Sequence, residues 1–391
     1  MRKINVLVIS LLLASCAHGG SPLPASWPSE GALSRPFAVV YALLYSFKNG
    51  SDAAYPYAGL TDVNGTLYGT TYGGGSTGGW GTVFRVSADG TEKVIYRFKA
   101  GNDGAHPYGD LTDVNGMLYG TTYQGGAGGN GTVFKVSTAG VEHVLYSFKA
   151  GNDGQYPYCR LLLVNSDLYG TTYTGGGGVG WGVVFKVTTG GQESVVYRFK
   201  AGKDGAHPWA GLINVNGMLY GTTYQGGSAG SGTVYKVTTS GKESVLYSFK
   251  GGNDGQYPYA PLLSYNGALF GTTYQGGVST GWGIVYRVST AGQEKVLYQF
   301  KAGNDGAHPQ FGRLVALNGE LYGTTYQGGT SGAGAVFEVS PAGAEHVIYS
   351  FKGGTDGQYP YAGLASLNAM LYSTTYQGGS DGFGTIFKLK P

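Results

Sequence analysis

The chain has 391 residues, 74 of them glycine, with only 12% charged residues and a formal net charge of +3 at pH 7. Glycine therefore makes up about a fifth of the chain, yet no Gly-X-Y period is present, which excludes collagen. An aromatic content of 14% excludes a disordered chain, two cysteines exclude a disulfide scaffold, and the lack of helical periodicity disfavours helical bundles. A β-rich, turn-rich protein remains.

The first element in the chain is a short export leader, residues 1–15. Arg2 and Lys3 supply positive charge, and the apolar run that follows is too short to span a bilayer. The leader ends in Leu13-Ala14-Ser15-Cys16, which resembles the lipobox of bacterial lipoproteins. This resemblance implies cleavage before Cys16 and lipidation of its thiol. An ordinary secretory leader with an incidental cysteine is the alternative.

Residues 16–36 are expected to form the lipidated cysteine and a flexible tether, because glycine and proline are frequent there. Ala17 stands where inner-membrane retention usually needs Asp, so we expect an outer-membrane lipoprotein, periplasmic or surface-exposed. The lipid anchor is then the link to the membrane, since no later stretch approaches the ~20 apolar residues of a spanning helix. Removing the leader lowers Lys+Arg from 25 to 23 against 22 acidic residues, so no nucleic-acid partner is expected.

After the tether, the chain consists of seven copies of one unit, which indicates a repeat fold. The phrase Tyr-x-Phe-Lys recurs at intervals of 50 or 51 residues, beginning at Tyr45, Tyr96, Tyr146, Tyr197, Tyr247, Tyr298 and Tyr349. A second phrase, Tyr-Gly-Thr-Thr-Tyr or a close variant, begins at Tyr68, Tyr119, Tyr169, Tyr220, Phe270, Tyr322 and Tyr372. We therefore expect one domain of seven repeats over residues 37–391.

Each copy predicts four strands. In the second copy, they are expected over residues 108–115, 117–123, 132–137 and 143–148. Asn115-Gly116 is a strong hairpin signal, because a type I′ turn needs positive φ at both central residues. A glycine-rich loop, residues 124–131, joins the second strand to the third. Four antiparallel strands in about 50 residues are typical of a propeller blade.

The two ends of the repeat region predict how the ring closes. The seventh copy has no fourth strand after residues 387–391, while an additional strand, residues 38–48, precedes the first copy. We expect that N-terminal strand to complete the last blade. The predicted fold is an all-β, seven-bladed β-propeller of four-stranded antiparallel blades. A linear solenoid is disfavoured because it would leave this strand unused and two sheet edges exposed.

Two repeat families resemble this sequence. The Asn-Gly turn, the aromatic strand ending in Gly-Gly and the Val-Phe-Lys-Val strand resemble the kelch repeat, although Tyr and Phe replace the usual kelch tryptophan. The wording Leu-Tyr-Gly-Thr-Thr-Tyr-x-Gly-Gly…Gly-Thr-Val-Phe-Lys-Val resembles the bacterial GloVer (Gloeo/Verruco-type) tandem repeat over roughly residues 38–391. That resemblance implies a surface protein with a repeat fold, and it implies no general biochemical activity.

Propeller topology places the long loops on one face, where two columns of residues alternate between copies. Before the proline of each crossing between blades, odd copies have tyrosine and even copies have histidine: Tyr55, Tyr156, Tyr257 and Tyr359 against His106, His207 and His308. In the glycine-rich loops, odd copies have a large aromatic residue and even copies a smaller one: Trp80, Trp181, Trp282 and Phe383 against Asn130, Ser231 and Ala333.

Two interpretations of these columns stay open. Flat aromatic faces near amide groups such as Gln124 suit sugar rings, whereas large rings between glycines also suit packing between blades. The histidines alternate between blades and would not converge on one zinc ion, so no metal is expected. The Asp-Gly pairs of the crossings, such as Asp103-Gly104, are interpreted as turns rather than calcium ligands.

A unique site in a symmetric repeat requires positions at which the copies differ. Before the shared leucine of the first strand, the copies have Gly59, Asp110, Arg160, Gly211, Pro261, Arg313 and Gly363. Asp110 and Arg160 lie in adjacent blades and can pair, and two arginines at a channel mouth suit a carboxylate or sulfate. A solvated ion pair is the alternative. Cys159 is interpreted as a small buried thiol rather than a nucleophile, because a nucleophile needs an activating base and none is evident.

These observations predict a non-catalytic cell-envelope binding protein whose multivalent loop face binds glycans or other surface polymers. The residues assigned to binding are the aromatic loop columns together with Asp110, Arg160 and Arg313. A propeller enzyme acting on carbohydrate at the channel mouth and a protein–protein interaction platform are the alternatives, so enzymatic activity is left open. No catalytic residue, metal or cofactor is assigned, and a monomeric propeller is expected. Fold alone does not decide, because propellers host unrelated functions.

Overall fold

The computed structural model describes residues 39–75, 78–178, 180–277 and 281–391. The chain divides into two units, Met1–Ala38 and Val39–Pro391, and the strands belong to the second. The predicted leader, the lipidated Cys16 and the tether lie outside the described residues. Within the described part of the chain, no helix is long and apolar enough to cross a membrane.

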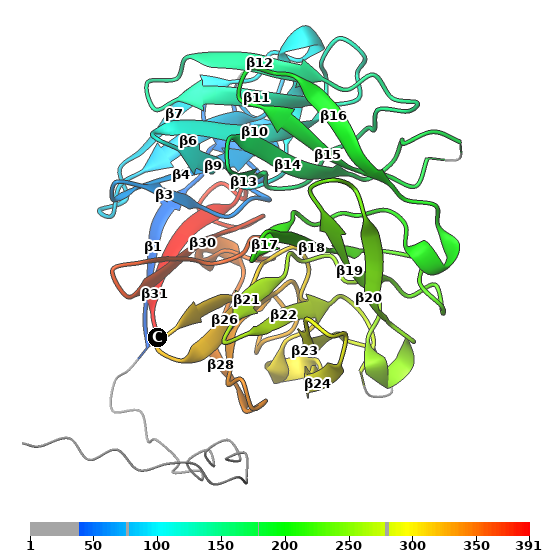
Figure 1. Ribbon diagram of the computed structural model, residues 1–391. Helices are drawn as coiled ribbons and strands as arrows, with labels where there is room; N and C mark the ends of the chain where they lie inside the picture. The colour runs from blue at the N-terminus through cyan, green and yellow to red at the C-terminus, as the bar shows by residue number, and fades with distance from the viewer. Residues whose placement is uncertain (1–38, 76–77, 179, 278–280) are drawn as a thin grey trace, which may run out of the picture. The chain divides into compact units, whose positions relative to one another are not determined.

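Val39–Pro391 forms a seven-bladed β-propeller of antiparallel sheets, as the sequence predicts (Figure 1). The first strands of neighbouring blades contact one another around the axis, for example β3 (Thr61–Val63) and β9 (Thr112–Val114). In blades 1 to 6, the strand order across each sheet follows the chain order. The first strand of each blade therefore lies nearest the axis, and the fourth strand forms the outer edge.

The blades contain the following strands. Blade 1 has β3, β4 (Thr66–Thr71), β6 (Thr82–Val86) and β7 (Glu92–Arg97), and blade 2 has β9, β10 (Met117–Gln124), β11 (Thr132–Ser137) and β12 (Glu142–Ser147). Blade 3 has β13 (Leu162–Val164), β14 (Asp167–Thr172), β15 (Val183–Thr188) and β16 (Glu193–Arg198). Blade 4 has β17 (Ile213–Val215), β18 (Met218–Thr223), β19 (Thr233–Thr238) and β20 (Glu243–Ser248). Blade 5 has β21 (Leu263–Tyr265), β22 (Ala268–Thr273), β23 (Ile284–Ser289) and β24 (Glu294–Gln299). Blade 6 has β25 (Val315–Leu317), β26 (Glu320–Thr325), β27 (Ala335–Val339) and β28 (Glu345–Ser350). Blade 7 has β29 (Ala365–Leu367), β30 (Met370–Thr375), β31 (Thr385–Lys390) and β1 (Val40–Ser46).

Short segments complete the crossings. Strand β8 (Ala105–Pro107) adds to blade 2, and β2 (Ala53–Ala54) pairs with β5 (Gly73–Gly74). Five crossings contain a 3-10 turn, namely η1 (Gly101–Asp103), η2 (Gly202–Asp204), η3 (Gly252–Asp254), η4 (Gly303–Asp305) and η5 (Gly354–Asp356).

The N-terminal strand closes the ring. Strand β1 pairs with β31, with Tyr41 opposite Leu389 and Leu43 opposite Phe387, so the two ends of the repeat region share blade 7. Figure 1 shows the blue β1 beside the red β31. The prediction that an N-terminal strand completes the last blade is confirmed, although the strand is shorter than the predicted 38–48.

The first strand of each blade is also shorter than predicted. In blade 2, the paired segment is Thr112–Val114 rather than residues 108–115. Residues 108–111 lie between β8 and β9, which both pair with β10, and they leave the ladder at the axis. The hairpin prediction is confirmed, because Asn115 and Gly116 have φ angles of 54° and 82°.

Aromatic pairs hold adjacent blades together, and both partners come from the repeated phrases. The phenylalanine of Tyr-x-Phe-Lys in one blade packs edge-to-face against the aromatic residue of the third strand in the next. The ring centroids of Phe98 and Phe134 are 5.1 Å apart at an interplanar angle of 73°, and those of Phe47 and Phe84 are 5.2 Å apart. Such pairs contribute about 0.5–1.5 kcal/mol beyond the burial of their area. The repeated sequence therefore encodes a repeated interface.

The glycine of Tyr-Gly-Thr-Thr-Tyr makes room for this ring. A Cβ atom on Gly120 would lie 2.6 Å from Cζ of Phe134, closer than side chains pack. Blade 7 has Ser373 at this position, and its hydroxyl donates a hydrogen bond to the Gly363 carbonyl at 2.9 Å. Close packing within the blade therefore favours glycine here, and blade 7 accommodates the small side chain of serine.

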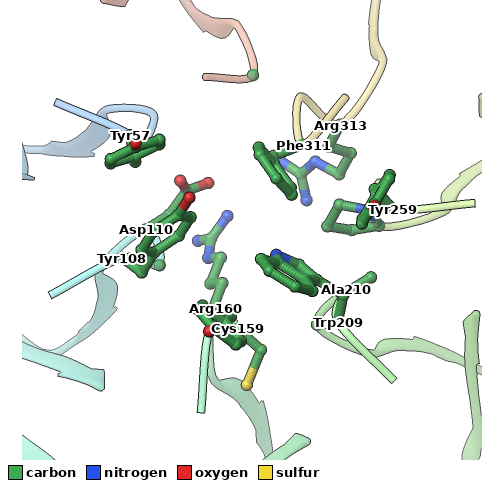
Figure 2. A pocket seen from close by; sticks show the side chains of 15 residues that line it. Tyr57, Tyr108, Asp110, Cys159, Arg160, Trp209, Ala210, Tyr259, Phe311 and Arg313 are labelled. Carbon is green, nitrogen blue, oxygen red and sulfur yellow. The ribbon is translucent and has the colours of Figure 1, made fainter. Parts of the chain in front are cut away.

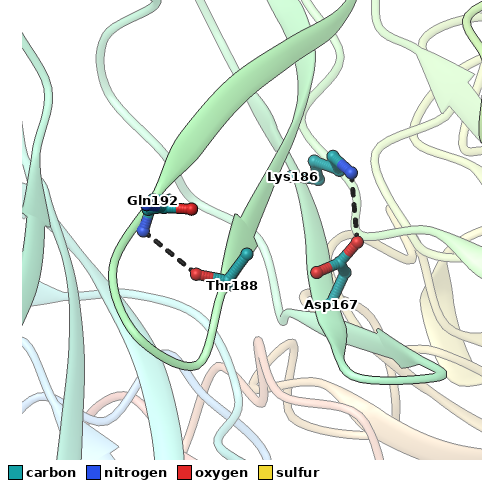
Figure 3. Close-up of polar contacts among 4 residues, drawn as sticks. All are labelled: Asp167, Lys186, Thr188 and Gln192. Atoms are coloured by element: carbon teal, nitrogen blue, oxygen red, sulfur yellow. Dashed lines mark hydrogen bonds and ion pairs between the residues drawn. The ribbon is translucent and has the colours of Figure 1, made fainter.

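The side of the propeller with the tight turns has compact surface contacts. In blade 3, Lys186 forms an ion pair with Asp167 at 3.1 Å, and the Gln192 backbone N–H donates to Thr188 Oγ1 at 3.1 Å (Figure 3). The hydrogen bond to Asp167, together with the charge of that carboxylate, raises the pKa of Lys186. Exposed pairs of this kind contribute little to stability.

Candidate functional site

Seven aromatic side chains, one from each blade, form a closed ring around the propeller axis. Each follows the proline of its crossing, directly in six blades and after one additional residue, Gln310, in blade 6. They are Tyr57, Tyr108, Tyr158, Trp209, Tyr259, Phe311 and Tyr361. The centroids of neighbouring rings are between 4.0 Å (Tyr158–Trp209) and 5.6 Å (Phe311–Tyr361) apart. We call this set the axial aromatic ring.

Side chains from blades 2, 4 and 6 also meet across the axis. The centroids of Trp209 and Phe311 are 5.3 Å apart and nearly parallel, although their blades are not adjacent. Tyr108 lies edge-on to both, at 6.2 Å from Trp209 and 5.9 Å from Phe311. Burial raises the pKa of Tyr108 well above its ordinary value. At this level, aromatic side chains fill the axis.

Sequence reasoning missed the axial aromatic ring, although a signal was available. An aromatic residue follows the crossing proline in every copy once Gln310 is treated as an insertion. The signal was hidden because the chain has 33 tyrosines, and an aromatic residue near a strand usually indicates core packing.

Three charged residues lie two positions further along the chain from the axial aromatic ring. Asp110, Arg160 and Arg313 follow Tyr108, Tyr158 and Phe311 by two residues, and in an extended chain such residues share a face. Figure 2 shows the two guanidinium groups and the Asp110 carboxylate directed toward the axis. The prediction that these three positions surround the axial channel is therefore supported by their placement.

A cavity of about 50 Å³ lies among these groups. Its lining includes all three charged residues and six members of the axial aromatic ring, and the other first-strand positions around it are small or lack a polar side chain. A single water needs only ~10–15 Å³ by this measure, so the cavity holds a few waters or one small polar group. It is too small for a whole sugar ring.

Asp110 is oriented by the backbone of the neighbouring blade. Its Oδ1 accepts a hydrogen bond from the Gly59 N–H at 2.6 Å. Within the described ranges, no ion pair joins Asp110 to Arg160 or Arg313, so the predicted Asp110–Arg160 pair is not formed as a direct contact. Burial and the positive charge of Arg160 lower the pKa of Arg313, and Asp110 opposes that shift. The cavity therefore holds like charges that Asp110 compensates in part.

Cys159 belongs to the blade rather than to the cavity chemistry. Its side chain is buried, and Figure 2 shows the sulfur directed away from the axis. The Thr171 N–H donates to Sγ at 3.2 Å, and burial raises the thiol pKa. A thiol with a raised pKa is a poor nucleophile at neutral pH, which agrees with its interpretation as a structural residue.

The two loop columns predicted from the sequence meet at the blade interfaces. Trp80 of blade 1 lies edge-to-face against His106, with ring centroids 5.4 Å apart. The same contact recurs at Trp181–His207 (5.3 Å), at Trp282–His308 (5.0 Å) and, with a tyrosine in place of histidine, at Phe383–Tyr55 (5.5 Å). Trp80 is 37% exposed, whereas the other three aromatic residues of its column are half-buried.

Each of these histidines is also held on its other side. His106 stacks on Tyr72 with ring centroids 4.2 Å apart, and its Nδ1 lies 2.8 Å from the Tyr72 carbonyl oxygen. His207 and His308 make the same pair of contacts with Tyr173 and Tyr274. Across the described ranges, no three His, Cys, Asp or Glu side chains are grouped so that they could hold a metal ion.

In three of the four tyrosine positions of this column, the facing residue is smaller than an aromatic ring. The backbone N–H of Tyr156 donates to the Asn130 carbonyl at 2.9 Å, and Tyr257 and Tyr359 donate in the same way to Ser231 and Ala333. All seven crossing residues before proline have φ angles of 55–61°. Non-glycine residues rarely adopt this conformation, which costs of order 1–3 kcal/mol each. The columns are therefore fixed by both packing and backbone, and their part in binding stays a prediction.

The outer rim contains a cluster of one tyrosine, one aspartate and one glutamate at six blade interfaces, and we call these the rim clusters. Between blades 1 and 2, the Tyr96 hydroxyl and the Lys99 N–H donate to the two oxygens of Asp103. Burial and the nearby Asp103 charge raise the pKa of Glu142 to about 7. The other five clusters are Tyr45–Asp52–Glu92, Tyr146–Asp153–Glu193, Tyr197–Asp204–Glu243, Tyr247–Asp254–Glu294 and Tyr298–Asp305–Glu345.

The interface between blades 6 and 7 differs. Tyr41 of β1 takes the place of the glutamate and stacks on Tyr349 with ring centroids 4.0 Å apart. Tyr349 still donates to Asp356 at 2.7 Å. The crossing aspartates thus accept hydrogen bonds within turns at all seven interfaces, which confirms their interpretation as turn residues.

The fold and its axial site define a tandem-repeat β-propeller in which one ring position carries unlike residues. The family is shown by sequence: residues 34–201 and 175–387 match the model of the Gloeobacter/Verrucomicrobia repeat, and the chain belongs to that family. The predicted resemblance is therefore confirmed. Among curated protein sequences, no match was found.

Solved structures of similar fold include a puromycin hydrolase, with a TM-score of 0.54 and 14% identity over 83% of this chain and 50% of that one. Another is PorZ, an essential bacterial surface component of the type-IX secretion system of Porphyromonas gingivalis, with a TM-score of 0.54 and 14% identity over 89% of this chain and 48% of that one. This chain spans about half the length of these proteins. At such low identity, the likeness concerns the fold.

Proposed function

We propose that this protein is a non-catalytic binding protein of the cell envelope and that its ligand site is the axial cavity. The supporting observation is that Arg160 and Arg313 converge on this cavity, while neither forms an ion pair within the part of the chain that the structure describes. Guanidinium groups have several N–H donors, and two of them around one cavity suit an anionic group. The ring contains this arrangement once, so one anion per propeller is expected.

The residues of the cavity favour binding over catalysis. Asp110 is the one carboxylate in the cavity lining, and the Gly59 N–H already occupies one of its oxygens. Acid–base hydrolysis of sugars usually needs two carboxyl groups, and nucleophilic catalysis needs an activated nucleophile. Cys159 is among the lining residues, but Figure 2 shows its sulfur directed away from the cavity. A carbohydrate-processing activity at this position therefore has less support than anion binding.

The test is a titration of the purified protein with acetate, formate, chloride, sulfate and phosphate at constant ionic strength. Intrinsic fluorescence is a suitable signal because Trp209 lines the cavity, and Trp209→Phe identifies its contribution. We expect saturable binding of at least one anion at a stoichiometry of one. Arg160→Gln and Arg313→Gln should each weaken that binding by about tenfold or more.

Arg198→Gln is the matched control. Arg198 lies at the end of β16 and donates to the Asn152 carbonyl at 3.3 Å, away from the cavity lining, so its loss should leave anion binding unchanged. The proposal fails if no anion binds, or if both cavity variants bind as the unchanged protein does.

A second candidate function, glycan binding on the loop face, is favoured by the exposure of Trp80. It is one of the four large hydrophobic residues exposed among those described, and His106 holds its ring in place. A glycan array probes this candidate. Saturable binding that is lost in the triple variant Trp80→Ala, Trp181→Ala, Trp282→Ala, while Arg160→Gln still binds, would favour the loop columns over the axial cavity.

The envelope location depends on the predicted lipobox. We propose that lipidated Cys16 anchors the protein in the outer membrane. Cys16→Ala should move the protein from the membrane fraction to the aqueous fraction and abolish labelling by a fatty-acid probe. Unchanged fractionation and unchanged labelling would contradict the anchor, and co-purification of an envelope protein would favour the interaction platform instead.

A further inference from the structure

One of the two cavity arginines is positioned by an insertion that breaks the sevenfold repeat. We call the positions equivalent to Asp110, Arg160 and Arg313 in the seven blades the charged layer. In six blades, the residue of this layer is the third after the crossing proline, as in Asp110 after Pro107. In blade 6, Arg313 is the fourth residue after Pro309. Gln310 is the additional residue. Blade 6 therefore reaches the axis with a backbone that differs from the other blades at the point where it supplies Arg313.

The insertion has a local cost in hydrogen bonding. The equivalent threonines of the other six blades each donate to a backbone carbonyl of the next blade, as Thr171 does to Ala210 at 2.9 Å. In blade 5, which precedes the insertion, the equivalent residue is Thr272, which is 1% exposed, and its hydroxyl has no hydrogen-bond partner among the described residues. Oε1 of Gln310 has no partner among them either. Each such buried group costs about 1–3 kcal/mol. A costly deviation from the repeat next to the cavity is typical of a functional site.

One further negative charge would neutralise the charged side chains that line the cavity. Two guanidinium groups and one carboxylate give a net charge of +1, because the remaining positions of this layer are Gly59, Gly211, Pro261 and Gly363. One monovalent anion neutralises the cavity, whereas sulfate would leave it negative. The energetic cost of the uncompensated charge left by sulfate is larger in surroundings of low polarity than in water.

The size and shape of the cavity point to a small planar group. Its volume is about 50 Å³, and flat aromatic side chains form much of its wall. A carboxylate is planar and matches the fork of a guanidinium with two parallel hydrogen bonds. Asp110 does not take the place of this group: its Oδ1 accepts the Gly59 N–H at 2.6 Å, and no ion pair joins it to either arginine within the described residues.

We propose that the axial cavity selects one carboxylate group over sulfate or other dianions, with Arg313 and Arg160 as its donors and Asp110 as the residue that sets the selectivity. This inference rests on the proposed function above. The carboxylate belongs either to a free short-chain acid or to the end of a thin extended chain, since the cavity admits no larger group. Asp110 acts through charge balance rather than by contact with the ligand.

The test compares acetate with sulfate in the unchanged protein and in Asp110→Asn. The unchanged protein should bind acetate at least about tenfold more tightly than sulfate. Asp110→Asn raises the cavity charge from +1 to +2 and should reverse that order. Asparagine keeps an oxygen acceptor for the Gly59 N–H, so the variant is expected to fold.

The control is Asp113→Asn. Asp113 accepts the Gly116 N–H in a hairpin turn, where blade 4 already has Asn214 in the same role, so this variant should keep the acetate preference. Sulfate binding as tightly as acetate in the unchanged protein, or an unchanged ratio in Asp110→Asn, overturns the carboxylate inference while the proposed function stands. Absence of any anion binding overturns both. Acetylglycylglycine binding more tightly than acetate assigns the carboxylate to a chain end, and the reverse assigns it to a free acid.

Discussion

The outer rim and the axis of this propeller differ in how closely they follow the sevenfold repeat. At the rim, one tyrosine–aspartate–glutamate cluster recurs at six interfaces with nearly the same contacts, as in Tyr96, Asp103 and Glu142. At the axis, the layer next to the axial aromatic ring has glycine in three blades, arginine in two, and aspartate and proline in one blade each, so its charged members lie in three of the seven blades. The contacts that join adjacent blades are thus repeated at the rim, whereas residues that differ between blades lie together at the axis.

This contrast separates stability from binding. A contact repeated six times can bind a ligand only multivalently, but it adds to stability at every interface. A single layer of unlike groups adds little to stability and can recognise one ligand. We therefore expect changes at the rim to alter unfolding, and changes at the axis to alter anion binding, as the following experiments test.

The largest expected effect comes from opening the ring itself. Deleting the chain through Ser46 removes β1 and leaves the β31 edge and the Phe387 side of blade 7 without cover. We expect loss of cooperative unfolding or assembly into larger species, because an uncovered strand edge pairs with other chains. Circular dichroism and size-exclusion chromatography measure this. A synthetic β1 peptide should restore the monomer, and a deletion variant that unfolds as the full chain does would contradict the closure.

The next effect is a pH dependence set by the rim clusters. Burial raises the pKa of Glu142 from 4.5 to about 7. Because the folded pKa is the higher one, this stabilising contribution is complete below about pH 4.5 and is lost as the pH rises through about 7. Six half-buried clusters at about 1 kcal/mol each, after screening, should lower the free energy of unfolding by several kcal/mol between pH 5 and pH 8.

Denaturant unfolding at a series of pH values measures this dependence. Glu142→Gln should remove about one sixth of it, whereas Tyr41→Phe, at the interface without a glutamate, should leave the slope unchanged. A free energy of unfolding that is constant between pH 5 and pH 8 would show that the rim glutamates are not protonated in the folded protein.

A smaller effect on the free energy of unfolding is expected from replacing tyrosine by phenylalanine, with opposite signs in the blade cores and at the rim. Tyr235 and Tyr286 replace phenylalanine in the blade cores, and their buried hydroxyls have no partner among the described residues. Tyr235→Phe and Tyr286→Phe should each raise the free energy of unfolding by about 1 kcal/mol. Tyr146→Phe removes the 2.9 Å hydrogen bond to Asp153 at the rim and should lower it by about 1–2 kcal/mol. Denaturant unfolding measures these changes. A change in the free energy of unfolding that has the same sign in the cores and at the rim would contradict this comparison.

The smallest expected effect on stability is at the axis. Arg313→Gln removes a half-buried charge that faces Arg160, so the free energy of unfolding should stay the same or rise by about 0.5 kcal/mol even though anion binding is lost. Thermal unfolding without added anion measures this. A loss of more than about 2 kcal/mol would assign Arg313 to the structural framework rather than to a site.

Much of the fold could be predicted because its physical causes are local and repeated. Asn115-Gly116 fixes a type I′ turn through its own backbone preference, and seven copies of Tyr-x-Phe-Lys define the blade period. The site was predicted only in part. Asp110, Arg160 and Arg313 were found as departures from the repeat, but Tyr57 and its six equivalents were not, because in the sequence they resemble ordinary core residues.

The sequence by itself determined the blade count, the turn chemistry, the closing strand and the position of the asymmetric layer, because each depends on neighbouring residues or on the repeat period. Only the tertiary structure decided which residues meet across the axis or between blades. Trp209 and Phe311 stack although about a hundred residues separate them, and Trp80 meets His106 across an interface. Such contacts follow from ring closure, which places residues by blade number rather than by sequence distance.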